Sequence, residues 1–134
     1  MARKRATTTK YEIVQTASEC FMEIGYSNTS PNLIANKLGI STGNLTYYYP
    51  TKEHLLYVMV EMLCDFQWNL IETEATRGIG SITSFCLETM TVAVACAESE
   101  IARDLFVSAF QSEMCRNYLR NNHALRAKRI FAGR

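Results

Sequence analysis

The chain has 134 residues, about the length of one domain. Of these, 48% are hydrophobic and 20% are charged, which is typical of a globular protein and excludes an intrinsically disordered one. The formal net charge is +1. No apolar stretch approaches the roughly 20 residues of a membrane-spanning helix, and none follows the basic N-terminus as it would in a secretory signal. We therefore expect a cytoplasmic protein that does not bind membranes.

The charges are unevenly distributed along the chain. Residues 1–54 have a net charge of +2, residues 55–115 one of −7, and residues 116–134 one of +6. Such segregation suggests that different parts of the chain meet different partners, although a solvated helix face gives the same pattern.

The five cysteines have neither the CxxC spacing of a redox pair nor that of a zinc finger. Each lies in an apolar segment of helical periodicity, so we interpret them as reduced core residues, with redox sensing as the alternative. They are Cys20, Cys64, Cys86, Cys96 and Cys115.

We expect the chain to begin with a flexible basic arm over residues 1–6. A helix capped by one of the threonines at 7–9 should then run to about Ile24. Its apolar side chains recur at helical rather than strand spacing, at offsets of 0, 4, 7, 8 and 11 from Ile13. Gly25 is expected to end it, as glycine often does past the last helical turn.

Two short helices are predicted next, at about 31–38 and 42–48. Ser30 is placed to cap the first of them and Ser41 or Thr42 the second, and Gly39 can adopt the positive φ of a tight turn between the two. Two helices joined in this way form a helix-turn-helix, which presents the outer face of its second helix to solvent or to a groove.

A long helix is expected over about 52–75, followed by a break at 77–80. The long helix is apolar almost all round at its start, which is typical of a helix buried in the middle of a domain. The next helix should begin at Ser81. Its predicted buried stripe is Ile82, Phe85, Cys86, Thr89, Ala93 and either Cys96 or Ala97.

The last part of the chain also has helical periodicity. Ser99 is placed to cap a further helix, and a final one is expected over about 112–132, with a weak point at Asn121–Asn122. No segment has strand alternation, so the predicted fold class is all-α.

The second short helix has an outer face without carboxylates. Asn can hydrogen-bond to a base edge, small residues let the backbone come close, and Tyr and Thr hydroxyls suit phosphate oxygens. Consecutive residues on a helix point in different directions, so the tyrosines at 47–49 cannot share one face and at least one should point outward. The alternative is that all three are core aromatics. Lys52 at a helix N-terminus opposes the helix dipole, so stability by itself does not explain it. The outer face comprises Thr42, Gly43, Asn44, Thr46, Tyr47 and Tyr48.

Several motifs follow one another in a family-specific order and spacing. They are Ile13 to Phe21 with Ala17, Gly25-Tyr26, Thr29-Ser30, Ile34-Ala35, Leu38-Gly39-Ile40-Ser41, Gly43-Asn44-Leu45, Tyr47-Tyr48-Tyr49-Pro50, and Thr51-Lys52-Glu53 with Leu55-Leu56. With these motifs, residues 11–56 resemble the DNA-binding domain of the TetR family of bacterial repressors. The resemblance covers about a third of the chain. It implies a sequence-specific transcriptional regulator, most often a repressor that binds a palindromic operator and is released by a small-molecule effector.

The resemblance also implies roles by position. The residues implied to touch phosphate at the first short helix are Thr29 and Ser30. Those implied to meet base edges are Thr42, Gly43 and Asn44. Those implied to clamp the DNA backbone are Tyr47, Tyr48 and Lys52. Tyr49, where the family more often has Phe, is implied to be core. The basic residues at 3–5 are either further DNA contacts or a solubilising tail.

The remainder fits the family's helical ligand-binding and dimerisation domain but has no diagnostic motif. We therefore expect a helix-turn-helix domain over 1–54 and an incomplete effector-binding domain over 55–134. In the family, two more helices follow and form a four-helix dimer interface. We expect the chain to be truncated before them, with a naturally minimal member as the alternative. A homodimer is implied if those helices are present.

A small-molecule pocket is expected in the second domain, because Met and aromatic side chains adapt to varied apolar ligands. Ordinary helical core is the alternative for each residue. The net charge of −7 makes an apolar cation or a lipid-like molecule a candidate effector. The expected lining residues are Met59, Met62, Leu63, Phe66, Leu70, Phe85, Met90 and Phe106.

We expect neither an enzyme nor a bound cofactor or metal. His54 and His123 are isolated, and the sequence has no nucleophile motif, glycine-rich phosphate loop or metal-ligand cluster. The alternative to a regulator is a truncated, DNA-defective helical module that binds other proteins.

Overall fold

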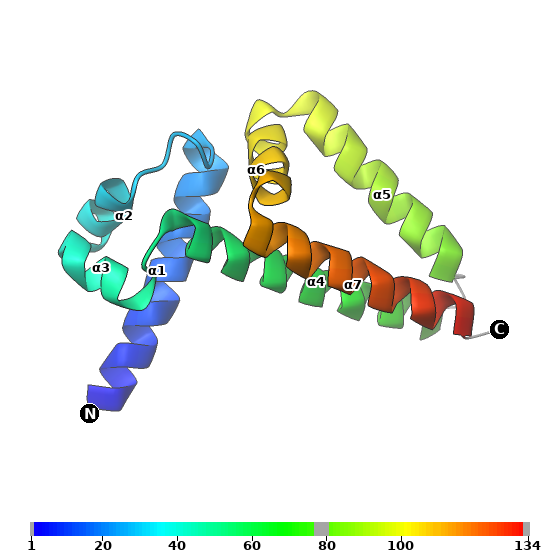
Figure 1. Cartoon of the computed structure of the whole chain (residues 1–134), viewed down its shortest axis with the longest axis horizontal. Helices are drawn as coiled ribbons and strands as arrows, with labels where there is room; N and C mark the ends of the chain where they lie inside the picture. The colour runs from blue at the N-terminus through cyan, green and yellow to red at the C-terminus, as the bar shows by residue number, and fades with distance from the viewer. Residues whose placement is uncertain (1, 77–80, 133–134) are drawn as a thin grey trace.

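In the computed structural model of the protein, the backbone is described for residues 2–76 and 81–132, and the side chains for residues 9–70 and 83–129. The regular structure in these ranges is entirely helical, which confirms the predicted all-α class. The described helices (Figure 1) are α1 (Ala2–Ile24), α2 (Pro31–Leu38), α3 (Thr42–Tyr48), α4 (Lys52–Thr76), α5 (Ser81–Glu98), α6 (Glu100–Gln111) and α7 (Glu113–Ala132). None of them is both long and apolar enough to cross a membrane.

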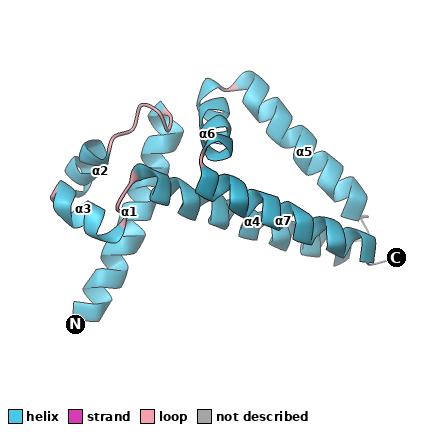
Figure 2. Ribbon diagram, in the orientation of Figure 1, coloured by secondary structure: helices cyan, strands magenta, loops and turns pink. Residues whose placement is uncertain are grey.

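Helix α4 joins two groups of helices. Its N-terminal end packs against α1, which in turn contacts α2, while α3 packs against α2. The rest of α4 packs against α5, α6 and α7, and α7 runs alongside it (Figure 1). The connections are short loops, with the longest one visible between α1 and α2 (Figure 2). Helix α6 also touches α1 and so links the two groups a second time.

Each group has its own hydrophobic core. The buried residues of the first are Ile13, Ala17, Cys20, Phe21, Ile34, Ala35, Leu45 and Leu55. Those of the second are Leu56, Val60, Cys64, Ala109 and Cys115. The two cores meet along α4, where Leu55 belongs to the first and Leu56 to the second, and Tyr26 and Leu105 pack against both.

The predicted caps and turns lie where the sequence places them. The side chains of Ser30, Ser41 and Ser99 each accept a hydrogen bond from the backbone N–H three residues later, at the starts of α2, α3 and α6. Gly25 and Gly39 both have positive φ, of 91° and 69°. These are conformations that residues with a Cβ rarely adopt, which explains why each helix ends at glycine.

The expected flexible arm over residues 1–6 is not separate from the first helix. Helix α1 begins at Ala2 and continues without a break through residues 2–6. The threonines at 7–9 lie inside the helix rather than capping it. The physical reason is local: the helix contains neither Pro nor Gly, and Ala, Arg and Lys are good helix formers. The side chains of Arg3, Lys4 and Arg5 lie outside the described residues.

The predicted buried stripe of α5 is wrong over the described side chains, none of which is fully buried. Cys86 is exposed, and Phe85, Thr89 and Ala93 are exposed as well. Helix α5 packs against α4 and α6 and is paired with α7 through Glu88, and several of its apolar side chains stay exposed. The break at 77–80 and the side chains of Ser81 and Ile82 lie outside the described residues.

Two further expectations are corrected. Helix α4 is buried at its start but not all round: Met62 is 55% exposed and Phe66 60%, because no described helix covers that side. Helix α7 continues through the expected weak point, with Asn122 buried inside it, since packing against α4 and α6 overrides a low helix propensity. Three of the five cysteines are buried as predicted, namely Cys20, Cys64 and Cys115.

Candidate nucleic-acid interface and internal cavity

Helices α2 and α3 form the predicted helix-turn-helix. Ile34, Ala35 and Leu45 are buried between these helices and α1, which fixes the side of α3 that faces the protein. The opposite side of α3 is open. Its exposed residues are Thr42, Gly43, Asn44 and Tyr47.

Hydrogen bonds set the start of α3. Thr42 Oγ1 donates to Asn32 Oδ1 at 2.7 Å, which ties α3 to α2. The backbone N–H of Asn44 donates to Ser41 Oγ at 3.0 Å, while the Asn44 side chain itself stays exposed. An exposed amide one turn into such a helix has the donor and the acceptor needed for a base edge.

Gly43 has no structural reason to be glycine. Its φ is not positive, and a Cβ added there would meet only Ser41 Oγ, at 4.0 Å. Glycine inside a helix costs about 0.5–1 kcal/mol relative to alanine. The fold therefore does not require glycine at this position, and the α3 backbone is open to close approach from outside.

The three consecutive tyrosines divide between surface and core. Tyr47 is 81% exposed, so one tyrosine does point outward as predicted. Tyr48 and Tyr49 pack against the first core, and burial raises the pKa of Tyr49. The rings of Tyr47 and Tyr48 meet edge to face, with centroids 5.1 Å apart, so the buried ring orients the exposed one.

Lys52 has an intramolecular role that the sequence did not reveal. Its Nζ donates to the backbone carbonyl of Tyr26 at 2.9 Å and lies 4.2 Å from the centroid of the Tyr26 ring. Burial lowers the pKa of Lys52, while burial raises that of Tyr26 to about 12. The lysine therefore fastens the start of α4 to the loop after α1, which explains its place at a helix N-terminus.

The two residues expected at phosphate from α2 differ in exposure. Thr29 is buried, and its Oγ1 donates to the carbonyl of Gly25 at 2.8 Å, so the hydroxyl is used inside the protein. Ser30 is exposed, but its Oγ accepts the N–H of Leu33 at 3.1 Å as the cap of α2. The side chain of Ser30 is thus the more accessible of the two.

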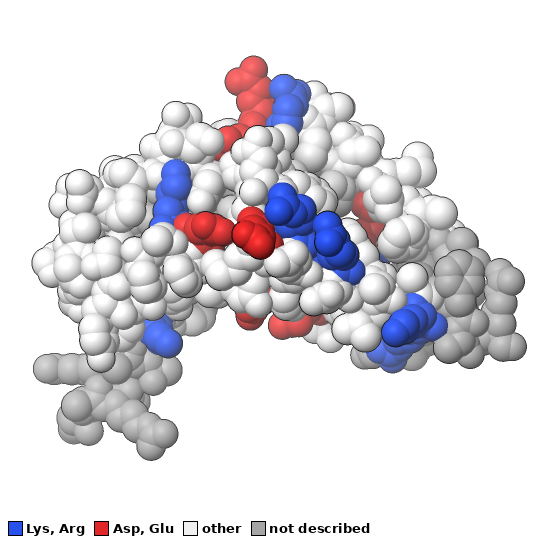
Figure 3. Space-filling view, in the orientation of Figure 1, with Lys and Arg blue, Asp and Glu red and all other residues white. Residues whose placement is uncertain are grey.

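The helix-turn-helix surface carries little charge. The sequence has no Asp or Glu between Glu23 and Glu53, and Lys37 pairs with Glu23 at 3.3 Å. On the face shown in Figure 3, charged side chains are sparse at the α2–α3 end, and acidic and basic ones lie next to each other nearer the middle. A polyanion approaching α3 therefore meets no carboxylate from this segment.

A polar junction joins the two groups of helices, and sequence reasoning missed it. Asp104 on α6 accepts the backbone N–H of Ser27 at 2.8 Å and also the Ser27 hydroxyl. These hydrogen bonds lower the pKa of Asp104. Glu53, at the start of α4, accepts the hydroxyl of Ser112. Because the partners are far apart in sequence, only the tertiary structure brings them together.

A cavity of about 280 Å³ lies among α4, α5, α6 and α7. A smaller one, of about 200 Å³, shares several of its residues, among them Val60, Leu63 and Phe106. Of the expected lining residues, Leu63, Phe85 and Phe106 line the larger cavity, and Met59, Leu63 and Phe106 the smaller. The four that line neither cavity and are instead exposed are Met62, Phe66, Leu70 and Met90.

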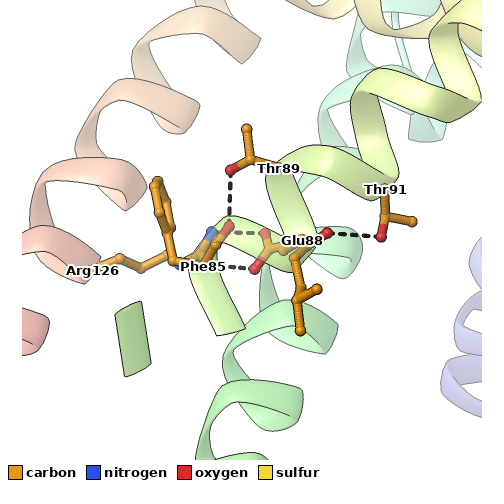
Figure 4. A network of polar contacts seen from close by, with 6 residues as sticks. Phe85, Glu88, Thr89, Thr91 and Arg126 are labelled. Carbon is orange, nitrogen blue, oxygen red and sulfur yellow. Dashed lines mark hydrogen bonds and ion pairs between the residues drawn. The ribbon is translucent and has the colours of Figure 1, made fainter. Parts of the chain in front are cut away.

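Sequence reasoning also missed the charged pair on the wall of the larger cavity. Arg126 lies in the basic segment 116–134, but its side chain is 2% exposed and forms an ion pair with Glu88 of α5 (Figure 4). The only available signal was the position of Arg126 on the apolar side of α7, one turn after Asn122.

Comparison with known proteins identifies the helix-turn-helix segment. The family described as "Bacterial regulatory proteins, tetR family" matches residues 13–58. The uncharacterized HTH-type transcriptional regulator YuxN of Bacillus subtilis is 34% identical over 73 residues, which are 54% of this chain and 25% of that protein. The HTH-type transcriptional regulator RutR of Escherichia coli K12 is 34% identical over 64 residues, 47% of this chain and 30% of that protein. The matched segment thus spans about a quarter to a third of these relatives.

Two solved structures share the fold more widely. The TetR-family repressor FadR of Thermus thermophilus, in complex with lauroyl-CoA, superposes with a TM-score of 0.62 and 22% identity over 92% of this chain and 59% of that one. A structure described as the molecular basis for control of antibiotic production by bacterial hormones superposes with a TM-score of 0.54 and 24% identity. The match covers 79% of this chain and 55% of that one. The likeness extends beyond residue 58 and so includes the helices around the cavity.

Proposed function

Because residues 13–58 belong to the tetR family of bacterial regulatory proteins, we propose that the protein is a transcriptional regulator that binds a specific double-stranded DNA operator. Helix α3 enters the major groove, and a small molecule bound among α4–α7 controls the affinity. The open face of α3 carries the proposal: it has an exposed amide, a glycine that the fold does not need, and no carboxylate.

The residues divide into direct contacts and positioning residues. Asn44 and Thr42 read base edges, and Gly43 lets the α3 backbone come close. Tyr47, with Tyr48 behind it, and Ser30 meet the phosphate backbone. Thr29 and Lys52 act through the protein, because their side chains hold Gly25 and Tyr26 in place.

The protein acts as a repressor on a palindromic operator, as two copies. A single short recognition helix covers one half-site only, and two linked half-sites raise the effective affinity without any new contact. Domains over 1–54 and 55–134 remain the proposed division. The two hydrophobic cores support it, although Leu55, just past this boundary, belongs to the first core. The location proposed is the cytoplasm, where bacterial DNA lies, and no catalytic step or cofactor is part of the role.

Helix α6 is the element proposed to transmit ligand binding. Its Phe106 and Ala109 line the cavity, while its Asp104 holds Ser27 of the loop that leads into α2. A ligand controls DNA binding only if it binds the DNA-competent and incompetent states with different affinity. A shift of α6 meets that condition, because it changes the cavity and the Ser27 contact together.

The test is a DNA selection followed by a titration. The full chain selects from random double-stranded oligonucleotides, and the enriched sequence is then titrated at two salt concentrations with the stoichiometry determined. We expect saturable binding by two or four chains to a palindrome, weakening steeply with salt because phosphate contacts release counterions.

Asn44→Ala is the matched variant. It removes one exposed amide and should relax the preference at one base position, with stability unchanged because the side chain is exposed. Weak binding without sequence preference by the wild-type chain contradicts the proposal and favours the helical protein-binding module instead.

A further inference from the structure

The charged lining residues of the larger cavity are Glu88 and Arg126. Arg126 of α7 donates from Nη1 to Glu88 Oε1 at 2.9 Å and from Nη2 to Glu88 Oε2, a two-pronged ion pair (Figure 4). The Arg126 side chain is 2% exposed and that of Glu88 21%. Burial of both charges together makes this part of the cavity wall electrically neutral rather than positive.

The guanidinium still has an unused donor. Arg126 Nε is buried and has no hydrogen-bond partner among the described residues, and the same is true of Asn122 Oδ1 one turn earlier on α7. Buried polar atoms in proteins are nearly always hydrogen-bonded, since leaving one unpaired costs its full desolvation energy. Arg126 lines the cavity, but its Nε has no exposed surface, so a ligand acceptor satisfies this donor once the side chain turns toward the cavity.

Most of the other lining residues are apolar, and the polar exceptions are Gln67, Thr89 and His123. Phe85 lies under the guanidinium, with its ring centroid 5.4 Å from Arg126 Cζ, and burial lowers the pKa of His123, which favours its neutral form. The apolar lining residues include Val60, Leu63, Val92, Phe106, Phe110 and Leu119. Among the lining residues, the carboxylate of Glu88 and the guanidinium of Arg126 cancel, so the wall presents no net charge.

We propose that this cavity takes a small, uncharged and mainly apolar molecule with a carbonyl-type hydrogen-bond acceptor at one end, and that the Arg126 side chain turns toward the cavity so that its Nε donates to this acceptor. The assignment rests on the proposed function, in which that molecule is the effector. An anionic head group would bring a second negative charge beside Glu88, and a cationic one would meet Arg126. The net charge of −7 over residues 55–115 therefore does not select an apolar cation, because it is not concentrated on this wall.

The size of the cavity limits the molecule. At about 280 Å³ it lies at the lower end of small-molecule sites, which span ~300–1,000 Å³. A probe with a chain of eight carbons is a suitable choice. Octanamide, octanoate and octylammonium have similar tails and differ in head group. The head group of octanamide is neutral and has a carbonyl acceptor, that of octanoate is anionic, and that of octylammonium is cationic.

The test is calorimetric titration of the full chain with each probe, without DNA, at pH 7. We expect octanamide to bind at least tenfold more tightly than octanoate or octylammonium. Equal or tighter binding of either charged probe overturns the assignment, and so does the absence of binding by all three.

Two variants test the roles of Arg126 and Glu88. Arg126→Lys keeps the charge opposite Glu88 but removes the Nε donor, so the affinity for octanamide should fall about tenfold. Glu88→Gln leaves the guanidinium without its counter-charge, so octanoate should gain at least tenfold relative to octanamide. Unchanged affinity ratios in folded variants overturn the assignment. If either variant fails to unfold cooperatively, the ranking of the three probes on the wild-type chain still decides.

The experiments distinguish a wrong ligand assignment from a wrong regulatory role. Octanamide that binds the protein but leaves its affinity for the selected operator unchanged contradicts ligand control and leaves the cavity assignment standing. Specific operator binding by a chain that binds none of the probes contradicts the cavity assignment and leaves the DNA-binding role standing.

Discussion

Leu55 and Leu56 are consecutive residues of α4, each only 1% exposed, yet they are buried in different hydrophobic cores. Consecutive side chains on a helix point about 100° apart, so the two leucines can face different groups of helices. Leu55 packs with the helix-turn-helix and Leu56 with the helices around the cavity. Helix α4 is thus a shared wall, and any rotation of it alters both cores at once.

Gly43→Ala should separate fold stability from DNA binding. The added methyl meets open space in the protein and removes the glycine penalty, so the free energy of unfolding should rise by up to about 1 kcal/mol. The operator affinity should fall, since the methyl lies on the face that approaches DNA. Urea unfolding and DNA titration measure the two effects.

Gly39→Ala is the control for that experiment. Its φ of 69° is left-handed, so alanine there should destabilise the protein by about 1–2 kcal/mol even though a Cβ would meet nothing within 4 Å. Unchanged operator affinity in a Gly43→Ala protein of raised stability would falsify the close approach of DNA at this glycine.

Tyr47→Ala should weaken operator binding without weakening the fold. The ring is 81% exposed, so its loss should change the free energy of unfolding by less than about 0.5 kcal/mol. We expect the affinity to fall about equally for all DNA sequences, because a phosphate contact carries no sequence information. Tyr48→Ala, which removes a ring packed on the core, should instead lower stability, and both are measured by thermal unfolding and DNA titration.

Lys52→Met should lower the free energy of unfolding by about 1–2 kcal/mol, because it removes a charged hydrogen bond to the Tyr26 carbonyl and a cation–π contact. Its effect on DNA affinity should be the same for all sequences, since the amine faces the protein backbone. A variant with the stability of the wild-type chain, or with a changed base preference, contradicts this role.

Asp104→Asn should destabilise the protein by about 1 kcal/mol at neutral pH, and the difference should depend on pH. The hydrogen bonds from Ser27 lower the pKa of Asp104, so the folded protein favours the charged carboxylate. The stability gained in this way is complete above the ordinary pKa of about 4 and is lost as the pH falls through the lowered value.

Urea unfolding of the wild-type protein and Asp104→Asn at several pH values between 3 and 7 measures that effect. The gap between the two should be constant from pH 5 to 7 and narrow below about pH 4. A gap that stays the same at pH 3 means that the Asp104 charge does not hold the junction.

The sequence by itself determined the features that depend on near neighbours. Ser30 and Ser41 cap their helices, and Gly25 and Gly39 end theirs, because capping bonds and positive φ involve residues only a few positions apart. The outward position of one tyrosine in three follows from helix geometry in the same way. The motifs of the helix-turn-helix lie in this local range, which is why the sequence alone shows the resemblance that the match over residues 13–58 supports.

Only the tertiary structure decided what those helices bury and where their charges go. Lys52 reaches a carbonyl 26 residues away, Asp104 a loop 77 residues away, and Arg126 a carboxylate 38 residues away. Helical periodicity marks Met62 and Phe66 as apolar but does not say whether another helix covers them, and in this structure none of the described helices does. Burial and pairing depend on which helices meet, and that is a property of the packed chain rather than of any one segment.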